Sequence, residues 1–282
     1  MFRSLQLQFI VGLISLVFIV IFQVSQSKDN QKSFINSQDI INRSVDMLSL
    51  VHNLERDVIE LQRSVLIYKS TGSSSAIARF EDLMDNVTNN LVLYELQIKE
   101  NNHTQSYQDL ITRMRSHLDD YRNNFLGVVD GSNLRQTLFS DDIEQKLTGI
   151  TKSLELKANS NISATSKNNI LEINYHLVNA QNAALQYFVL PDNALIADFN
   201  KQIKIADTML KQKTAIEYVE AGSTLADIKK SFVKLTNITR GHSYLINVVM
   251  AGSANEFLFL TKEIAHLVRE QQSATSAKIL KT

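Results

Sequence analysis

Two arginines one heptad apart, Arg56 and Arg63, are the first residues whose type and spacing suggest chemistry. Seven residues make about two helical turns, so both guanidinium groups lie on one stripe of a helix. Guanidinium groups bind carboxylates through paired hydrogen bonds, so the two arginines predict a clamp for a dicarboxylate. Because both fall opposite the apolar side of their helix, the favoured alternative is a solvated face or a contact between two copies.

A second candidate site is the polar group Thr239, Arg240 and His242. Thr239 and His242 interrupt an otherwise apolar helical pattern, and polar groups at core positions need hydrogen-bond partners. A cavity that holds a bound anion or water supplies such partners, so we expect ligand contact here. An alternative role for His242 is that of a pH-responsive core residue.

Two further pairs of candidates are related by a constant separation of 119 residues. Gln62 and Gln181 flank apolar helical faces, where they are placed to reach a ligand between helices or to satisfy neighbouring polar groups. Tyr68 and Tyr187 each close an apolar face near a turn. Core packing is the favoured interpretation for the tyrosines, and ligand contact is the alternative.

The elements that position these residues are helices with a regular apolar seam. Along the first seam, residues are spaced alternately by four and three positions: Met47, Val51, Leu54, Val58, Leu61, Val65 and Tyr68. The second seam has the same spacing 119 positions later: Ile170, Ile173, Leu177, Ala180, Ala184 and Tyr187. This spacing is typical of helices that pack against other helices. Identities at the same separation, such as Phe80 with Phe199, predict a duplicated helical module.

Composition supports long helices and excludes several functions. The 282 residues include one Pro, eight Gly and no Cys, so breakers are rare and disulfides are absent. The 29 basic and 29 acidic residues balance, which gives no electrostatic case for a nucleic-acid partner. We find no phosphate loop, no nucleophile motif and one isolated Glu-x-x-His pair, Glu263 with His266. We therefore expect no enzyme activity, no metal site and no cofactor in this chain.

Turn signals divide the chain into about six expected helices. The expected ranges are 28–70, 75–100, 104–126, 140–190, 193–219 and a long last helix from 223. The expected breaks are Thr71–Ser75, Asn101–Thr104, the loop 127–136, Pro191 with Asp192, and 221–223, where Ser140, Asp192 and Ser223 act as N-caps. The last seam is expected at Leu225, Ile228, Phe232, Leu235, Thr239, His242, Ile246, Val249, Ser253, Phe257, Leu260, Ile264 and Leu267.

Residues 5–24 form an apolar run of membrane-spanning length that leads without a linker into the first helix. Arg3 precedes the run, whereas Lys28 and Asp29 after it cancel, which favours a cytoplasmic N-terminus. The alternative is a cleaved signal peptide, for which the run is long and the cleavage signal poor. We expect an anchor at 1–27 in a bacterial inner membrane and a periplasmic region at 28–282, with repeats at about 28–126 and 140–282.

The anchor that runs into a helix, the segments 54–80 and 173–199, and the segment 243–268 together resemble a known family. They are similar to the helical bimodular sensor domain of bacterial transmembrane receptors, found in some chemoreceptors and hybrid histidine kinases. The resemblance implies an all-α, elongated double four-helix bundle in the periplasm. It further implies a homodimer that binds a small organic anion or a periplasmic binding protein and passes a helix shift across the membrane.

One departure from that family is that no second apolar run precedes Thr282. We expect a sensor portion that ends before the second span, from a longer parent such as a histidine kinase. The alternative is a single-anchor helical rod that has a structural or interaction role in the cell envelope and no signalling output.

Overall fold

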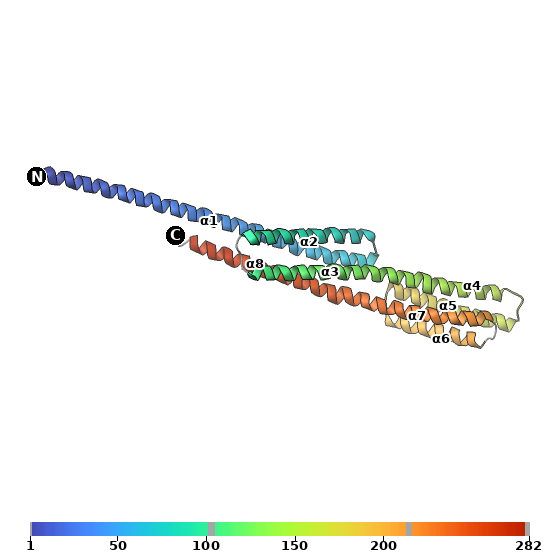
Figure 1. The fold of residues 1–282 in the computed structure, drawn as a ribbon. Helices are drawn as coiled ribbons and strands as arrows, with labels where there is room; N and C mark the ends of the chain where they lie inside the picture. The colour runs from blue at the N-terminus through green and yellow to red at the C-terminus, as the bar shows by residue number, and fades with distance from the viewer. Residues whose placement is uncertain (1, 101–104, 213–215, 280–282) are drawn as a thin grey trace. The chain divides into compact units, whose positions relative to one another are not determined.

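The computed structural model describes residues 2–100, 105–212 and 216–279, and within these ranges it contains helices and turns but no strand (Figure 1). The α-helices are α1 Phe2–Thr71, α2 Ser74–Glu100, α3 Gln105–Thr137, α4 Gln145–Ala158, α5 Ala164–Val189, α6 Asn193–Lys211, α7 Ile216–Tyr244 and α8 Ala251–Ile279. Two π-helical segments, η1 Leu138–Glu144 and η2 Leu245–Met250, join α3 to α4 and α7 to α8. The described residues thus form six uninterrupted helical runs, and the predicted all-α fold class is confirmed.

The chain divides into two compact units. Unit 1 comprises Met1–Asp120 and Ser253–Thr282, and unit 2 comprises Tyr121–Gly252. The units are defined by contacts between residues, whereas the predicted repeats follow chain order. The repeat boundaries at 28–126 and 140–282 therefore stay a prediction.

Unit 1 packs α1, α2, the first part of α3 and most of α8 around the first apolar seam. All seven residues of that seam, from Met47 to Tyr68, are buried. Polar side-chain contacts also join each neighbouring pair of helices: Arg79 with Glu60, Arg115 with Glu95 (2.8 Å), Arg113 with Glu256 (2.8 Å), and Thr261 with Glu55 (3.3 Å). These contacts follow the ring α2–α1, α3–α2, α3–α8 and α8–α1, so unit 1 is a four-helix bundle.

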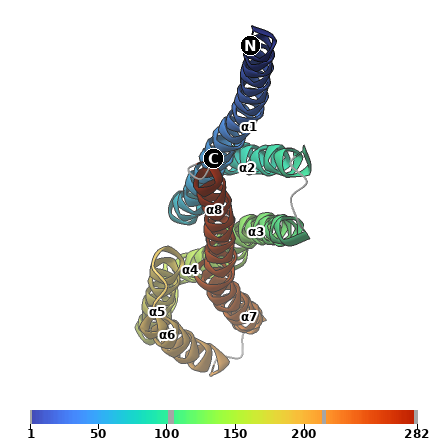
Figure 2. The ribbon, with the colours of Figure 1, turned by 90° about the vertical axis from the view of Figure 1, so that its left-hand side faces the viewer.

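Unit 2 packs the run from α3 through η1 to α4 with α5, α6 and α7 (Figure 2). Its core contains the whole second seam together with Phe199 and Phe232. The rings of Phe199 and Phe232 stack with centroids 3.8 Å apart, and the Tyr187 ring meets Phe232 edge-on at 5.6 Å. Such aromatic groups bury large apolar areas, so they contribute strongly to the stability of this bundle.

The two seams occupy comparable places in their units. Each lies on the first helix of a helical hairpin, α1 with α2 in unit 1 and α5 with α6 in unit 2. The buried residues of the second hairpin helices correspond at the same separation of 119: Phe80 with Phe199, Met84 with Ile203, Val87 with Ala206, and Leu91 with Leu210. The burial pattern therefore agrees with a duplicated helical hairpin.

Two predicted breaks have the expected physical cause. Helix α1 ends at Thr71 and Gly72 adopts a φ of 62°, a left-handed conformation that favours glycine. The backbone N–H of Ala194 donates to Asp192 Oδ1 at 2.9 Å, so Asp192 is the N-cap of α6. The break expected at Asn101–Thr104 lies outside the described residues.

The loop expected at 127–136 is wrong, because these residues continue α3. A Cβ atom at Gly127 would lie 3.6 Å from Leu245 Cδ2, and one at Gly131 would lie 3.5 Å from His242 Cδ2. These two glycines thus face the helical run that contains α7 and η2 at close range. Here the small residues permit close helix packing instead of ending a helix.

The single helix expected at 140–190 is also wrong. Helix α4 ends at Ala158, and α5 begins after Ser163, whose side chain accepts a hydrogen bond from the backbone N–H of Ser166 at 3.2 Å. Ser140 lies within η1 and is no N-cap. The turn expected at 221–223 is wrong as well, because these residues lie inside α7.

The last seam is buried as predicted from Leu225 to Ile246 and again at Phe257, Leu260 and Ile264. Buried residues continue at Met250, Ala254 and Val268, whereas Val249, Ser253 and Leu267 are only partly buried. The one-position differences at Met250, Ala254 and Val268 begin in η2, where a π-helical turn holds an extra residue.

Within the described residues, one helical stretch, Glu220–Ala277, has the length and composition to cross a membrane, and 33% of its most apolar window is buried. Leu225, Ile228 and Phe232 of this stretch belong to the core of unit 2. A core helix of a bundle meets the same criteria, so we assign this stretch to the bundle.

Candidate functional site

A cluster of two arginines, a tyrosine and a threonine in unit 2 is the candidate site. Arg135 comes from α3, Tyr187 from α5, and Thr239 and Arg240 from α7. We call these four residues the arginine cluster. Their helices bring together positions that are separated by about 50 and 100 residues along the chain.

Tyr187 lies at the centre of the arginine cluster and its side chain is buried. Thr239 Oγ1 donates to the carbonyl oxygen of Leu235 at 2.8 Å, and a side-chain hydrogen bond also links Thr239 to Tyr187. Burial raises the pKa of Tyr187, and the charge of Arg240, the bond to Thr239 and the charge of Arg135 oppose that rise. Both guanidinium charges therefore act on the tyrosine hydroxyl.

Arg135 is the less exposed of the two cations. Its Nη2 donates to the carbonyl oxygen of Phe188 at 2.9 Å, and its guanidinium carbon lies 5.2 Å from the centroid of the Phe188 ring. Its Nε is buried and has no hydrogen-bond partner in the described part of the chain. Burial lowers the pKa of Arg135, since the charged form is partly desolvated. One N–H donor of a desolvated cation thus lacks an acceptor.

Arg240 lies at the exposed side of the cluster. Its Nη2 donates to Asn193 Oδ1 at 3.0 Å, a neutral acceptor at the start of α6. Among the residues that the structure describes, no carboxylate forms an ion pair with Arg135 or Arg240. Two guanidinium groups without a counter-charge, beside two hydroxyl groups, form an arrangement that suits an anion.

The structure brings together three of the residues that the sequence singled out, Tyr187, Thr239 and Arg240. His242 lies one turn further along α7, where its Nε2 donates to the carbonyl oxygen of Val128 at 3.0 Å. Because a carbonyl oxygen only accepts, this contact fixes the proton on Nε2. Gln181 Nε2 donates to Thr148 Oγ1 at 3.3 Å, which agrees with a role in satisfying a neighbouring polar group.

The other four predicted site residues lie on α1 in unit 1. Arg56 is exposed and contacts the adjacent Asp57 at 3.1 Å, and Arg63 is exposed with Glu60 at 3.6 Å. Both arginines thus lie on a solvated face, as the alternative interpretation held. Tyr68 is buried and Gln62 is half-buried. Ligand contact by any of these four residues stays a prediction.

Arg135 is the site residue that the sequence did not reveal. It falls in the stretch that was expected to be a loop, and its contacts, Phe188 and Tyr187, are more than 50 residues away. No local pattern marks a charged residue that meets its neighbours only through the tertiary fold.

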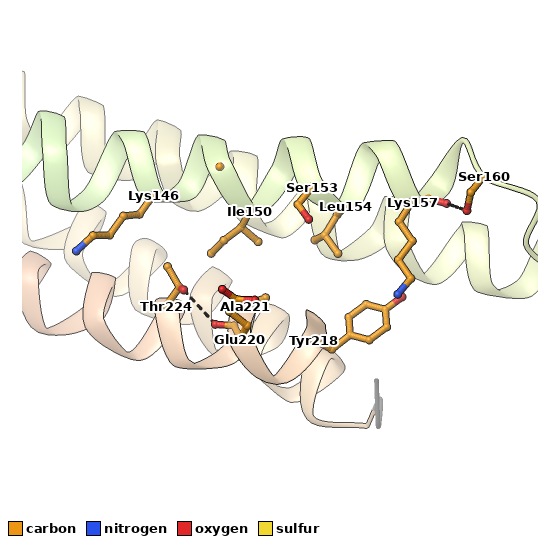
Figure 3. Close-up of a pocket in the computed structure, with 11 residues that line it drawn as sticks. Lys146, Ile150, Ser153, Leu154, Lys157, Ser160, Tyr218, Glu220, Ala221 and Thr224 are labelled. Atoms are coloured by element: carbon orange, nitrogen blue, oxygen red, sulfur yellow. Dashed lines mark hydrogen bonds between the residues drawn. The ribbon is translucent and has the colours of Figure 1, made fainter. Parts of the chain in front are cut away.

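A groove of about 600 Å³ between α4 and α7 is a second feature of unit 2 (Figure 3). Ile150 and Leu154 form its apolar wall on α4, and Lys157 Nζ lies 4.4 Å from the centroid of the Tyr218 ring on α7. Lys146, at the other end, forms an ion pair with Asp142 at 2.7 Å. Because these lysines have partners in unit 2, the groove is a poorer anion site than the arginine cluster.

Comparisons with known proteins establish the fold. No protein-family description matches the sequence, and no curated protein matches it either. Among solved structures, the sensor domain of the histidine kinase sensor TorS from V. parahaemolyticus is similar, with a TM-score of 0.55 and 13% sequence identity. The match covers 81% of this chain and 99% of that domain. The sensor-domain fold implied by the sequence resemblance is therefore confirmed.

Proposed function

We propose that this chain is the periplasmic ligand-sensing input region of a bacterial transmembrane receptor, and that it binds a small organic anion at the arginine cluster. The observation that carries the ligand class is Arg135, a partly desolvated cation with a buried, unpartnered Nε and no ion pair in the described residues. The sensor-domain fold supports the receptor context.

The chemistry of the cluster suits a carboxylate. A carboxylate oxygen that accepts from Arg135 Nε gives this donor its missing hydrogen bond, and charge-assisted bonds of this kind are stronger than neutral ones. Arg240, at the exposed side, attracts the anion and completes the charge balance.

Binding at this cluster would bias helix packing within unit 2, because its residues come from α3, α5 and α7. Helix α7 continues through η2 into α8 as one helical run. An anion that draws α7 towards α3 would therefore shift or rotate this helical run by a small amount. This is the kind of displacement that a receptor input region passes on.

The proposed anchor is the N-terminal part of α1. Helix α1 extends from Phe2 to Thr71 without a break, so the predicted span at 5–24 leads directly into the first seam. The described apolar side chains in this part are exposed in the isolated chain: Leu16, Phe18, Ile19, Val20, Ile21, Phe22 and Val24. A lipid surround would cover these side chains, which supports a membrane position.

Thermal unfolding of the full chain in detergent tests the proposal. A carboxylate such as succinate or acetate at a hundredfold excess over its Kd adds about 2.7 kcal/mol to the free energy of unfolding. For a unit of this size that gain raises Tm by about 5–10 °C relative to chloride at equal ionic strength. Arg135→Met abolishes the shift, whereas the matched surface variant Arg63→Met keeps it.

Two other outcomes would overturn the proposed ligand. If no anion shifts Tm and a periplasmic binding protein forms a complex with the chain, the ligand of this input region is a binding protein and not a small anion. If neither has any effect, the chain behaves as the single-anchor structural protein described above. A shift that survives Arg135→Met places the anion outside the arginine cluster.

A further inference from the structure

Helix α5 has a second apolar face that points away from the core of unit 2. Five large apolar side chains on this face are between 43% and 73% exposed: Leu171, Tyr175, Val178, Leu185 and Val189. The core face of the same helix is formed by other residues, among them Ile173, Leu177 and Ala184. A surface helix normally has one apolar face, and monomeric proteins rarely expose a second one of this length. We call the exposed residues 171–189 of this face the outer seam.

The outer seam has the spacing of a coiled coil. With Asn182 included, its positions are separated by steps of 4, 3, 4, 3 and 4 residues. Such a 3.5-residue repeat keeps one face of a helix against a neighbouring helix along the whole contact. The seam extends over 18 residue steps, about 27 Å at 1.5 Å per residue. The occupant that fits it is therefore a helix that runs along α5.

The residue types indicate which helix that is. In heptad notation Leu171, Val178 and Leu185 occupy the d positions, and Tyr175, Asn182 and Val189 occupy the a positions. Leucine at d with a β-branched residue at a favours two-stranded pairing, and an asparagine at a central a position pairs with its own copy in a parallel dimer. Asn182 is exposed between two apolar neighbours of the seam, where a second copy of itself would satisfy its amide.

The flanking charges are complementary in such a pair. In a parallel dimer each g residue meets the e residue five positions later on the other helix. Lys167 at g therefore meets Glu172 of the second copy, and both side chains are exposed. The next two e positions carry neutral residues, Asn179 and Gln186. The g residues that precede them bond within unit 2: Asn174 is buried and donates to the carbonyl oxygen of Thr151, and Gln181 donates to Thr148 Oγ1. Two copies thus approach with an attractive pair and no like-charge contact at the flanks.

The corresponding face of α1 lacks these properties. At a separation of 119 residues, Ile59 corresponds to Val178, and Arg56 and Arg63 correspond to the a positions Tyr175 and Asn182. Self-pairing at that face would bring each arginine against its own copy, which is unfavourable. The repeat therefore gives α1 and α5 corresponding outer faces, and only the residue types on α5 suit pairing with a second copy.

We propose that two copies of this chain pair in parallel through the outer seam of α5. Two copies anchored in one bilayer are related by rotation about the membrane normal, so equal helices in them run in the same direction. The parallel pairing that the outer seam favours is therefore compatible with two copies anchored in the same bilayer. The pairing is independent of the arginine cluster, because Tyr187, its member on α5, lies on the buried core face of that helix and not on the outer seam. Failure of anion binding therefore leaves this proposal standing.

Cysteine crosslinking of the full chain in detergent or lipid nanodiscs tests the pairing, because the chain has no native Cys. A d-position residue meets its own copy in a parallel pair, so Val178→Cys is expected to form a disulfide-linked dimer on mild oxidation. The matched control is Ile59→Cys, the repeat counterpart of Val178 with similar exposure. It is expected to stay monomeric. Equal or stronger crosslinking at Ile59, or none at Val178, overturns the proposal.

Molar mass gives a second measurement that does not depend on disulfide chemistry. Light scattering on the full chain in detergent is expected to show a dimer for wild type and a monomer for the variant with Val178→Glu and Leu185→Glu. Circular dichroism checks the fold of this variant, which the two surface changes should leave intact. A monomeric wild type, or a double variant that remains dimeric, contradicts pairing through α5, whether or not another protein binds this face.

Discussion

The hydroxyl group of Tyr94 on α2 allows a quantitative test of the packing of unit 1. The side chain is fully buried and its hydroxyl has no hydrogen-bond partner in the described part of the chain. Burial, with a smaller effect from Tyr107, raises the pKa of Tyr94 far above its ordinary 10.0. Replacing Tyr94 by Phe removes the unsatisfied group and keeps the ring, so we expect Tyr94→Phe to stabilise the fold by about 1 kcal/mol at pH 7.

The same variant changes the response to alkali, and the sign follows from the direction of the pKa shift. A raised folded-state pKa means that the stability contributed by the protonated hydroxyl is complete below pH 10 and decreases as pH rises towards the folded pKa. Between pH 10 and pH 11 the unfolded state gains about 1 kcal/mol by losing this proton, which the folded state retains. Tyr94→Phe has no such hydroxyl and keeps its stability over this range. The difference in free energy of unfolding between the variant and wild type therefore grows by about 1 kcal/mol from pH 10 to pH 11.

Urea unfolding followed by far-ultraviolet circular dichroism at pH 7, 10 and 11 measures both effects. Tyr244→Phe is the control, because the Tyr244 side chain is exposed and its variant should follow wild type. The buried tyrosines Tyr107, Tyr121 and Tyr187, whose pKa values are also raised, are present in all three proteins and cancel in the comparison. A constant difference between Tyr94→Phe and wild type from pH 7 to pH 11 would refute the reasoning.

Three further substitutions concern stability, and urea unfolding measures all three. Phe232→Ala removes the ring that stacks on Phe199 and meets Tyr187, so we expect a loss of about 3–5 kcal/mol, and a loss below about 1 kcal/mol would contradict the packing of unit 2. Gly72→Ala should cost about 1 kcal/mol because of the positive φ. Gly149→Ala inside α4 should gain about 0.5–1 kcal/mol. No atom lies within 4 Å of the added Cβ at either glycine, so effects of the same sign would contradict the backbone argument.

Apolar periodicity predicted the parts of the fold that depend on burial. Every residue of the seams at 47–68 and 170–187 is buried, because these apolar residues share one helical face that packs against the other helices of its unit. The breaks at Gly72 and Asp192 were also predictable, since a left-handed conformation and an N-cap each demand particular residue types.

Glycine has two structural roles in this chain, and the sequence does not distinguish between them. Gly72 ends a helix, whereas Gly127 and Gly131 sit inside α3 and face Leu245 and His242 at close range. Only the position of the second helix decides between these roles. The π-helical segment η2 likewise has no compositional signal, so burial at Met250 and Ala254 instead of Val249 and Ser253 could not be predicted.

The candidate site was predictable in part. Thr239 is predictable because a polar residue interrupts an apolar seam, and Tyr187 because it is the counterpart of Tyr68 in the repeat. Arg135 was missed, since an arginine in a stretch with two glycines resembles a surface loop. Its importance depends on Phe188 and Tyr187, which the tertiary fold places beside it.

The most direct test of the proposed anion site is a crystal structure of the chain with its tightest-binding organic anion. The arrangement of the arginine cluster predicts an anion oxygen within hydrogen-bond distance of Arg135 Nε, beside Tyr187 and Arg240. An anion held between Arg56 and Arg63, with Arg135 Nε still unpartnered, would contradict it.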